Sequence, residues 1–440
     1  MKQLKKIILA SAIMTILNLI HMNSFIIFIP CITIHTSVQA QDITGLKISG
    51  YGTISGTVHD RTDVHPVRDV SQSPENRFKT NFSAVMDSRL GLQAHYRFGS
   101  NFDAVVQGVL RDQSYVTFQN SMELAYLAYR PLSWLELRGG RVGYDAFLMS
   151  DTRNLGYAYP WVRPPIEFYG WIPVFHTDGI DTTFRIEGDD SQWRLRLQGG
   201  KQSFKFSLAE SEYDAETEEL YTVSLSRQSG SITLKTGFSS FSSKNEMDVF
   251  IPLIQGLDSI AEAAAVPFPD ISKEARSLSE NISFEGTDVT YLTFGASYDD
   301  GEWIAQAEIA HTTTSSDILS HGTMGYLALG YRINDFTPYC ILSATRAGND
   351  IRKPIADWSP IGEDSWIQEQ AVYMINTTRM DQKTLSIGVR WDFYNQVALK
   401  FQLDSFHINS CGYGLWFSKL ATFNNDSAMT LGTISLEFMF

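Results

Sequence analysis

The sequence predicts an all-β fold, a transmembrane antiparallel β-barrel of about 16 strands. Three observations predict it: segments that alternate polar and apolar residues, very short turns that join these segments in pairs, and longer connections that separate the pairs. Successive residues of a strand point to opposite faces, so a wall with lipid outside and water inside alternates along the chain. The mean hydropathy of −0.13 agrees, because such a wall mixes its apolar residues with polar ones.

The first 40 residues have the pattern of a secretory signal peptide. Three lysines precede an apolar run at 7–20, and Val38-Gln39-Ala40 provides a cleavage site. The alternative is an uncleaved helical anchor, but the second apolar run at 25–34 is too short to span a membrane. We therefore expect residues 1–40 to be removed and the barrel to occupy 41–440.

The chain is acidic. Its formal net charge is −14, and loss of Lys2, Lys5 and Lys6 with the signal peptide would make it −17. Such an excess argues against nucleic acid as a partner. Cys340 and Cys411 would remain, too few for a disulfide framework, and whether they pair stays open. Because no metal-spaced Cys/His cluster or nucleotide fingerprint is present in the sequence, we expect no metal and no cofactor.

The strands follow from alternation and from seven tight turns. In the second strand, Leu90, Leu92 and Ala94 alternate with other residues before the turn at 99–101. An opening strand and a closing strand complete the count. The expected spans are 44–58, 84–98, 102–115, 120–130, 134–143, 178–187, 192–202, 219–227, 231–241, 287–298, 303–315, 323–333, 336–346, 383–393, 396–408 and 428–440.

The closing strand and the loop lengths show which kind of barrel to expect. Ile434, Leu436, Phe438 and Phe440 share one face of the closing strand, and the other face is polar. Both chain ends and all short turns fall at one end of the barrel, and all long loops fall at the other. Bacterial outer-membrane barrels have an even strand number, short periplasmic turns and longer external loops. Sixteen strands leave room for an aqueous channel.

Aromatic residues flank the short turns and predict a girdle at one membrane interface. The alternative explanation is the ordinary preference of aromatic residues for strands. Clustering at the turns favours the girdle. The residues are Tyr96, Phe98, Phe102, Trp134, Trp193, Tyr298, Trp303, Tyr331, Phe336, Trp391, Phe393, Tyr394, Phe438 and Phe440.

The connection at 144–177 is far longer than a hairpin loop and rich in Tyr, Trp, Phe and Pro. A loop that only contacts solvent would be polar, so this one must pack on something. Here the chain resembles the Gram-negative outer-membrane porins, the family of sixteen-stranded general and specific diffusion porins. The resemblance rests on Gly140-Arg141-Val142-Gly143, which leads into this loop, and on the terminal Phe440.

The resemblance implies that the third external loop folds into the barrel, carries acidic residues and faces basic residues on the opposite wall. It implies a water-filled outer-membrane channel for passive diffusion of ions and small hydrophilic solutes. It also implies contact with outer-membrane lipid and lipopolysaccharide, and assembly as a homotrimer. Two departures stand out. Arg153 and Arg163 are interleaved with the acidic residues of the loop, and the second external loop near 117–119, which latches neighbours in trimeric porins, is very short.

A set of candidate residues for the constriction follows. Asp145, Asp151 and Glu167 should lie across the lumen from wall arginines and create a transverse field. Strict alternation would point Arg141 at lipid, but we expect a bulge at Gly139-Gly140 to turn it inward. The candidates are Arg89, Arg111, Arg138, Arg141, Asp145, Asp151, Arg153, Arg163 and Glu167.

Strand parity places further basic residues on the inner face. For each of them, solvation by lumen water or pairing with Asp103, Glu123, Glu136 or Asp404 is the simpler interpretation. Together, charges across a narrow pore would set its ion preference. These residues are Arg97, Arg185, Arg194, Arg196, Arg390 and Lys400.

We do not expect an enzyme, although two alternatives to passive diffusion stay open. The aromatic, arginine-rich third loop could guide one class of solute, which would make a substrate-selective outer-membrane channel. An outer-membrane hydrolase would need a nucleophile beside a histidine at the barrel rim. The nearest sequence is His311 before Thr312-Thr313-Thr314, which we interpret as a polar loop edge.

Overall fold

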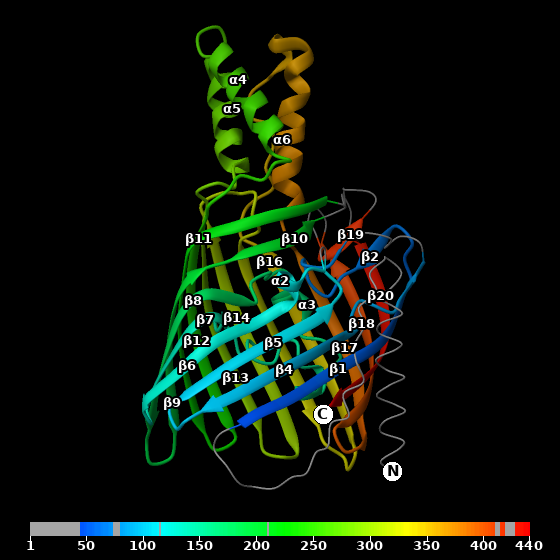
Figure 1. Ribbon diagram of the computed structural model, residues 1–440. Helices are drawn as coiled ribbons and strands as arrows, with labels where there is room; N and C mark the ends of the chain where they lie inside the picture. Colours follow the sequence, from blue (N-terminus) through cyan, green and yellow to red (C-terminus); the bar gives the residue numbers. More distant parts are fainter. Residues whose placement is uncertain (1–44, 74–79, 114–115, 209–210, 410–413, 419–426) are drawn as a thin grey trace.

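A computed structural model describes residues 45–73, 80–113, 116–208, 211–409, 414–418 and 427–440; the predicted signal peptide and Cys411 lie outside these ranges. Sixteen antiparallel strands form one closed barrel, which confirms the predicted fold (Figure 1). The barrel strands are β1 (Gly45–His59), β4 (Arg89–Phe98), β5 (Phe102–Arg111), β6 (Met122–Leu132), β7 (Leu135–Gly143), β8 (His176–Glu187), β9 (Gln192–Lys201), β11 (Ser211–Ser229), β12 (Ile232–Ser243), β13 (Asp288–Asp299), β14 (Trp303–Thr314), β15 (Gly322–Tyr331), β16 (Phe336–Ala347), β17 (Gln382–Tyr394), β18 (Val397–Ile408) and β20 (Ser427–Met439).

The first and last strands close the barrel. β1 pairs with β4 on one side and with β20 on the other. Gly50 N donates to Phe440 O, and Phe440 N donates back to Gly50 O, both at 2.9 Å. A Cβ atom on Gly52 would lie 2.4 Å from the ring of Phe438, so a glycine on β1 leaves room for an aromatic side chain of the closing strand.

Side chains sort to the two faces of the wall as alternation requires. Leu92, Leu292, Leu342 and Leu385 lie exposed on the outer face, among many other aliphatic residues. Exposed aromatic side chains gather near the short turns, where the sequence predicts a girdle. They include Phe98, Phe102, Trp134, Trp193, Tyr298, Trp303, Phe336, Trp391, Phe393, Tyr394 and Phe440.

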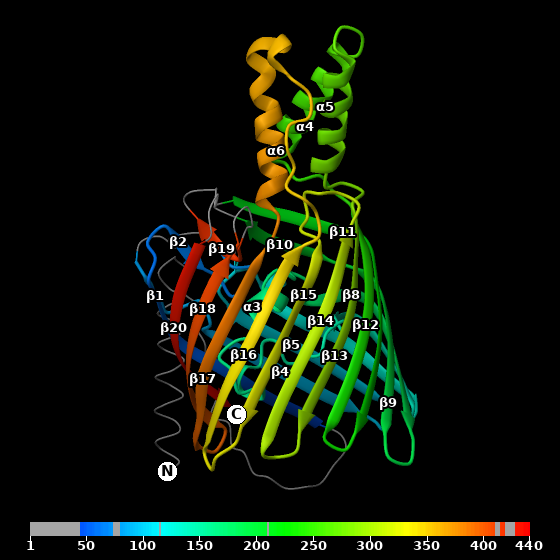
Figure 2. The same ribbon diagram turned by 180° about the vertical axis from the view of Figure 1, so that it is seen from behind.

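The long connections carry the remaining elements. The short strands are β2 (Val64–Pro66), β3 (Phe82–Ser83), β10 (Ser203–Leu208) and β19 (Trp416–Ser418), and β10 pairs with the outer part of β11. The helices are α2 (Phe118–Ser121), η2 (Gly156–Ala158), α3 (Ile166–Tyr169), α4 (Ile251–Ala263), α5 (Pro269–Ile282), η3 (Ser359–Ser365) and α6 (Trp366–Thr377). None of the helices in the described ranges is long and apolar enough to cross a membrane. Helices α4, α5 and α6 project together beyond the long-loop end (Figures 1 and 2).

The structure has two apolar cores, one at the long-loop end and one inside the barrel. The first joins α4, α5 and α6 to residues of the other long loops, among them Val70, Phe206 and Leu415. The second lies inside the barrel, where Phe147, Trp161 and Phe168 of the third long loop pack on inward-facing strand residues. The interior therefore contains packed side chains at this level, in addition to polar wall residues.

Candidate pore constriction

The third long loop, residues 144–175 between β7 and β8, packs against the inner wall. Its hydrogen bonds and ion pairs reach inward side chains of β9, β11, β12, β13, β14, β15, β16, β17, β18 and β20. The rings of Phe147 and Tyr291 meet edge to face, as do those of Phe168 and Tyr326. The aromatic content of the loop is thus explained, because these rings fill the space between loop and wall.

The loop begins at a buried ionic cluster. Asp145 forms ion pairs with Lys235 of β12 and, at 3.3 Å, with Arg196 of β9, and Ser224 Oγ donates to it at 2.8 Å. Burial alone would raise the pKa of Asp145, but the charges of Lys235 and Arg196 outweigh it and hold the pKa well below its ordinary value. A Cβ atom on Gly237 would lie 2.2 Å from Ala146 O, so a glycine on β12 permits this close approach.

The middle of the loop is fixed by Arg163. Its guanidinium donates to both carboxylate oxygens of Asp87, to Asp404 at 2.6 Å and to Thr433 Oγ1 at 2.5 Å. All three charged side chains are buried. Burial alone would raise the pKa of Asp87, but Arg163, with Arg68 and Arg89 nearby, lowers it to about 2. Asp87 therefore stays ionised and keeps its ion pair at any physiological pH.

Lys400 of β18 holds the same part of the loop through backbone carbonyls. Its Nζ donates to the carbonyl oxygens of Gly156, Tyr159 and Trp161 at 2.7, 2.8 and 2.7 Å. The ammonium also lies 3.8 Å from Glu437 of the closing strand. Arg390 of β17 likewise donates to Tyr157 O at 2.7 Å. These two predicted lumen residues therefore bind the loop.

Two further buried carboxylates bind neutral groups. Glu167, in α3, accepts from Ser343 at 2.5 Å, from Gln382 at 2.6 Å and from Thr384. Glu308 of β14 accepts from Leu148 N at 2.7 Å, from Tyr326 at 2.8 Å and from Tyr169. These bonds satisfy the two carboxylates without a cation and fix the loop to the wall from β14 to β17.

At the end of the loop, the ring of Phe175 lies between two guanidinium groups, and one of them belongs to Arg111 of β5. The guanidinium of Arg111 lies 4.1 Å from the ring centroid of Phe175, and that of Arg153 lies 4.0 Å from the same centroid. Arg153 also donates to Tyr169 O and Ile172 O, at 2.6 and 2.7 Å. Its burial lowers its pKa to about 10. Arg153 therefore stabilises the loop through contacts with other residues of the same loop.

In the described part of the chain the loop carboxylates form no ion pair with Arg89, Arg111, Arg138 or Arg141, and the expected transverse field across the lumen stays a prediction. Asp145 and Asp151 lie beside Arg196, and Glu167 binds neutral groups. The named arginines have other acidic neighbours: Asp87 for Arg89, Asp69 and Glu123 for Arg111, and Glu136 and Asp181 for Arg138. The physical reason is local, because each arginine already has a carboxylate on its own or an adjacent segment.

The expected inward position of Arg141 is wrong. The pairing of β7 is continuous through Gly139 and Gly140 with both β6 and β8, so no bulge interrupts the alternation. Arg141 stays on the outer face by parity with Leu137. There it forms a two-point ion pair with Asp178 at 2.7 and 2.8 Å. This neighbour on β8 offsets the charge that an outward arginine brings to the wall.

Four arginines line the inner wall of β4–β9 near the short turns. The side chains of Arg97, Arg130, Arg185 and Arg194 are 32–44% exposed. Their carboxylate partners Asp103 and Glu136 are at most 7% exposed. Asp151 in the first part of the third loop is the exception, because its side chain is 57% exposed and lies 3.9 Å from Arg194. The wall therefore presents mainly guanidinium groups to the lumen.

Sequence reasoning missed Lys235, Asp87, Glu308 and Arg130 as site residues. Parity would have found Lys235 and Glu308, which share the inward face with their neighbours two positions away. Asp87 precedes β4 but lies within the predicted span 84–98, where parity with Arg89 places it on the inner face. Nothing in its sequence context singles it out as the partner of Arg163.

The first long loop, which connects β1 to β4, packs on the third long loop. Residues 64–72 are buried, Val70 N donates to Gly170 O at 2.7 Å, and Arg68 forms an ion pair with Asp87 at 3.0 Å. A small cavity of about 40 Å³ remains at the mouth, lined by residues that include Arg111, Glu123, Phe175 and Gln202. The first loop thus narrows the mouth beside β4–β6, where Arg111 also binds Ser71.

Two solved structures share the barrel over nearly the whole chain. OmpF of Salmonella typhi, in complex with daunomycin, is 11% identical, with 90% of this chain and 98% of that chain covered and a TM-score of 0.51. An anion-selective porin from Comamonas acidovorans is 11% identical, with 90% and 100% covered and a TM-score of 0.50. No protein-family model and no curated protein sequence matches. The likeness shows that the chain has the porin fold.

Proposed function

We propose that the protein is an outer-membrane channel for ions and small hydrophilic solutes, narrowed by its third loop to a passage along β4–β9. The porin fold, the outward aliphatic band and the aromatic rim support the membrane location. Cleavage of residues 1–40 and assembly as a homotrimer in contact with outer-membrane lipid belong to the same proposal. Passage needs no energy input, so diffusion is passive.

The observation that carries the proposal is an asymmetry of burial around the lumen. Inward side chains of β12–β20 are buried against the loop, as Lys235, Glu308, Ser343, Thr384, Lys400 and Glu437 show. Some inward side chains of β4–β7, namely Gln93, Gln107 and Arg138, stay partly exposed, although others on the same wall, such as Arg89, are buried. The space for solutes therefore lies between the loop and the arginine-bearing wall.

The charge of that wall favours anions. Arg97, Arg130 and Arg185 are exposed above nearly buried carboxylates, so a passing solute meets guanidinium groups first. Glu187 at the adjacent turn is exposed and provides an opposing charge at the rim. The expected preference is therefore for anions over cations of the same size, even though the chain as a whole is acidic.

Planar-bilayer recording of the purified full-length protein tests the proposal against its two alternatives. Small, stepwise, ohmic conductance with a reversal potential on the anion side supports it. Block of the current by low concentrations of a single solute would favour the substrate-selective channel instead. No conductance from correctly folded protein would contradict the proposal and leave the hydrolase.

A further inference from the structure

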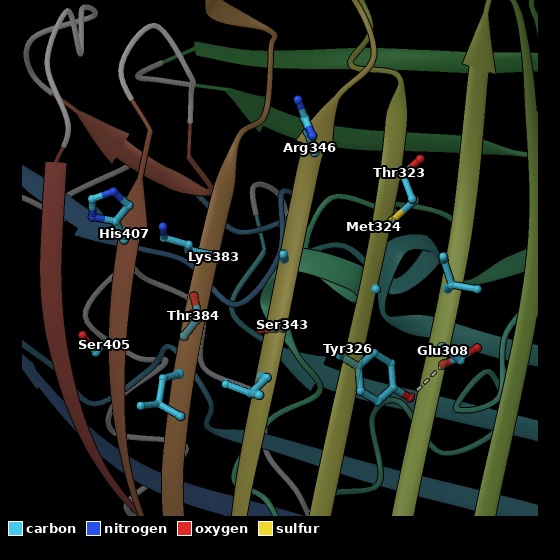
Figure 3. A pocket seen from close by; sticks show the side chains of 15 residues that line it. Glu308, Thr323, Met324, Tyr326, Ser343, Arg346, Lys383, Thr384, Ser405 and His407 are labelled. Carbon is cyan, nitrogen blue, oxygen red and sulfur yellow. Dashed lines mark hydrogen bonds between the residues drawn. The ribbon is translucent and has the colours of Figure 1, made fainter.

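A hollow of about 960 Å³ lies on the outer face of the barrel wall, over β14–β18. Figure 3 shows it, with Thr323, Arg346, Lys383 and His407 toward the long-loop end. The outward position follows from alternation, because Ile309, Leu342 and Leu385 in the same lining are half-exposed members of the aliphatic band. The lining also includes Glu308, Ser343 and Thr384, whose side chains point inward to the third loop, so the hollow lies on the outer side of the wall segment that carries this loop.

Small residues form the floor of the hollow. Pairing places Ile309, Gly325, Ala344 and Lys383 in one row across four strands. The next row toward the short turns contains Leu342, Leu385 and Ser405. Gly325, Ala344 and Ser405 leave a depression between the larger side chains of Ile309, Leu342 and Leu385.

Two basic side chains border this depression on its long-loop side. Lys383 pairs with Ala344, and Arg346 follows two residues later on the same face, so the two cations are diagonal neighbours on adjacent strands. Both are exposed. Within the described part of the chain, neither forms an ion pair. Exposed, unpaired cations directly beside an aliphatic surface match an amphiphile with an anionic head and an apolar tail.

We infer that this hollow binds a phosphate-bearing lipid of the surrounding outer leaflet. The phosphate lies between Lys383 and Arg346, where both side chains donate charge-assisted hydrogen bonds. The acyl chain lies over Leu342, Leu385 and Ile309. Because this inference rests on the proposed membrane location, its test measures lipid binding directly and does not depend on conductance.

The test is native mass spectrometry of the full-length protein in mild detergent with added diphosphorylated lipid A. Wild-type protein should retain the lipid, and the double variant Lys383→Gln/Arg346→Gln should retain it about tenfold less, since two charge-assisted contacts are lost. Arg227→Gln is the matched control, because it removes an outward cation near the short turns beside Trp193. Excess inorganic phosphate should not displace the lipid.

Equal retention by wild type and double variant would overturn the inference, as would displacement by inorganic phosphate, which would mark a simple anion site. A change in oligomeric mass without a change in lipid retention would also overturn it and show that a second copy covers this face. Bilayer conductance of the double variant, measured in parallel, should equal that of the wild type. Loss of conductance in both proteins would count against the channel and leave the lipid result intact.

Discussion

Arg163 of the third loop donates to Asp404 of β18 at 2.6 Å, across 241 residues of sequence. The same guanidinium binds Asp87, just before β4, so one loop side chain joins two distant parts of the wall. Both carboxylates are buried, and Arg163 is their shared cation. The position of the loop and the stability of the barrel are therefore coupled at this residue.

Replacing Arg163 should destabilise the protein strongly. Arg163→Met leaves two buried carboxylates with reduced compensation, and breaking a buried pair in this way costs about 3–5 kcal/mol. Urea unfolding in lipid vesicles, followed by tryptophan fluorescence, measures the free energy of unfolding. Arg194→Met is the control, because Arg194 is half-exposed and its nearest carboxylate is 3.9 Å away; its effect should stay below about 0.5 kcal/mol. Equal effects for the two variants would contradict the coupling.

Acid should weaken the ion pair between Asp87 and Arg163, and with it the stability of the protein, over a defined pH range. The pKa of Asp87 is lowered from 3.8 to about 2 in the folded protein. A lowered pKa contributes stability that is complete above the unfolded value and is lost as the pH falls through the folded one, here about 2 kcal/mol between pH 4 and pH 2. Unfolding free energy should therefore decline across this window. In Asp87→Asn the decline should be smaller, and an identical pH profile for the two proteins would exclude Asp87 as the group responsible.

Neutralising the exposed arginines on the inner face of β4–β9 should change ion selectivity. In Arg97→Gln/Arg185→Gln the carboxylates of Asp103 and Glu136 remain while two exposed cations are lost, so the reversal potential in a salt gradient should move toward cations. Arg141→Ser is the control, since Arg141 lies on the outer face and pairs with Asp178. It should leave the reversal potential unchanged. A shift for Arg141→Ser alone would place that residue in the lumen after all.

The sequence predicts the wall much better than the contacts of the loop. Alternation is a local property, so it places Lys400 and Arg196 on the inner face and Phe440 at the closure without any knowledge of the fold. Arg141 shows the limit, because paired glycines permit a bulge without requiring one. The loop partners depend on which strands face each other across a closed barrel. The contacts of Asp145 with Lys235 and of Arg163 with Asp87 could therefore not be read from spacing.

The most direct test of the central claim is the single-channel conductance of a protein that lacks Leu148–Pro165, compared with the wild type in the same planar bilayer. This deletion removes the segment that binds Lys400 and Asp404 of β18 and Thr433 of β20, and it retains Asp145 with its partners Lys235 and Arg196. Circular dichroism and heat-modifiable mobility on gels verify that the barrel still folds. The conductance should be several times that of the wild type. An unchanged conductance from a folded barrel would contradict this prediction, because the loop would then not limit the passage.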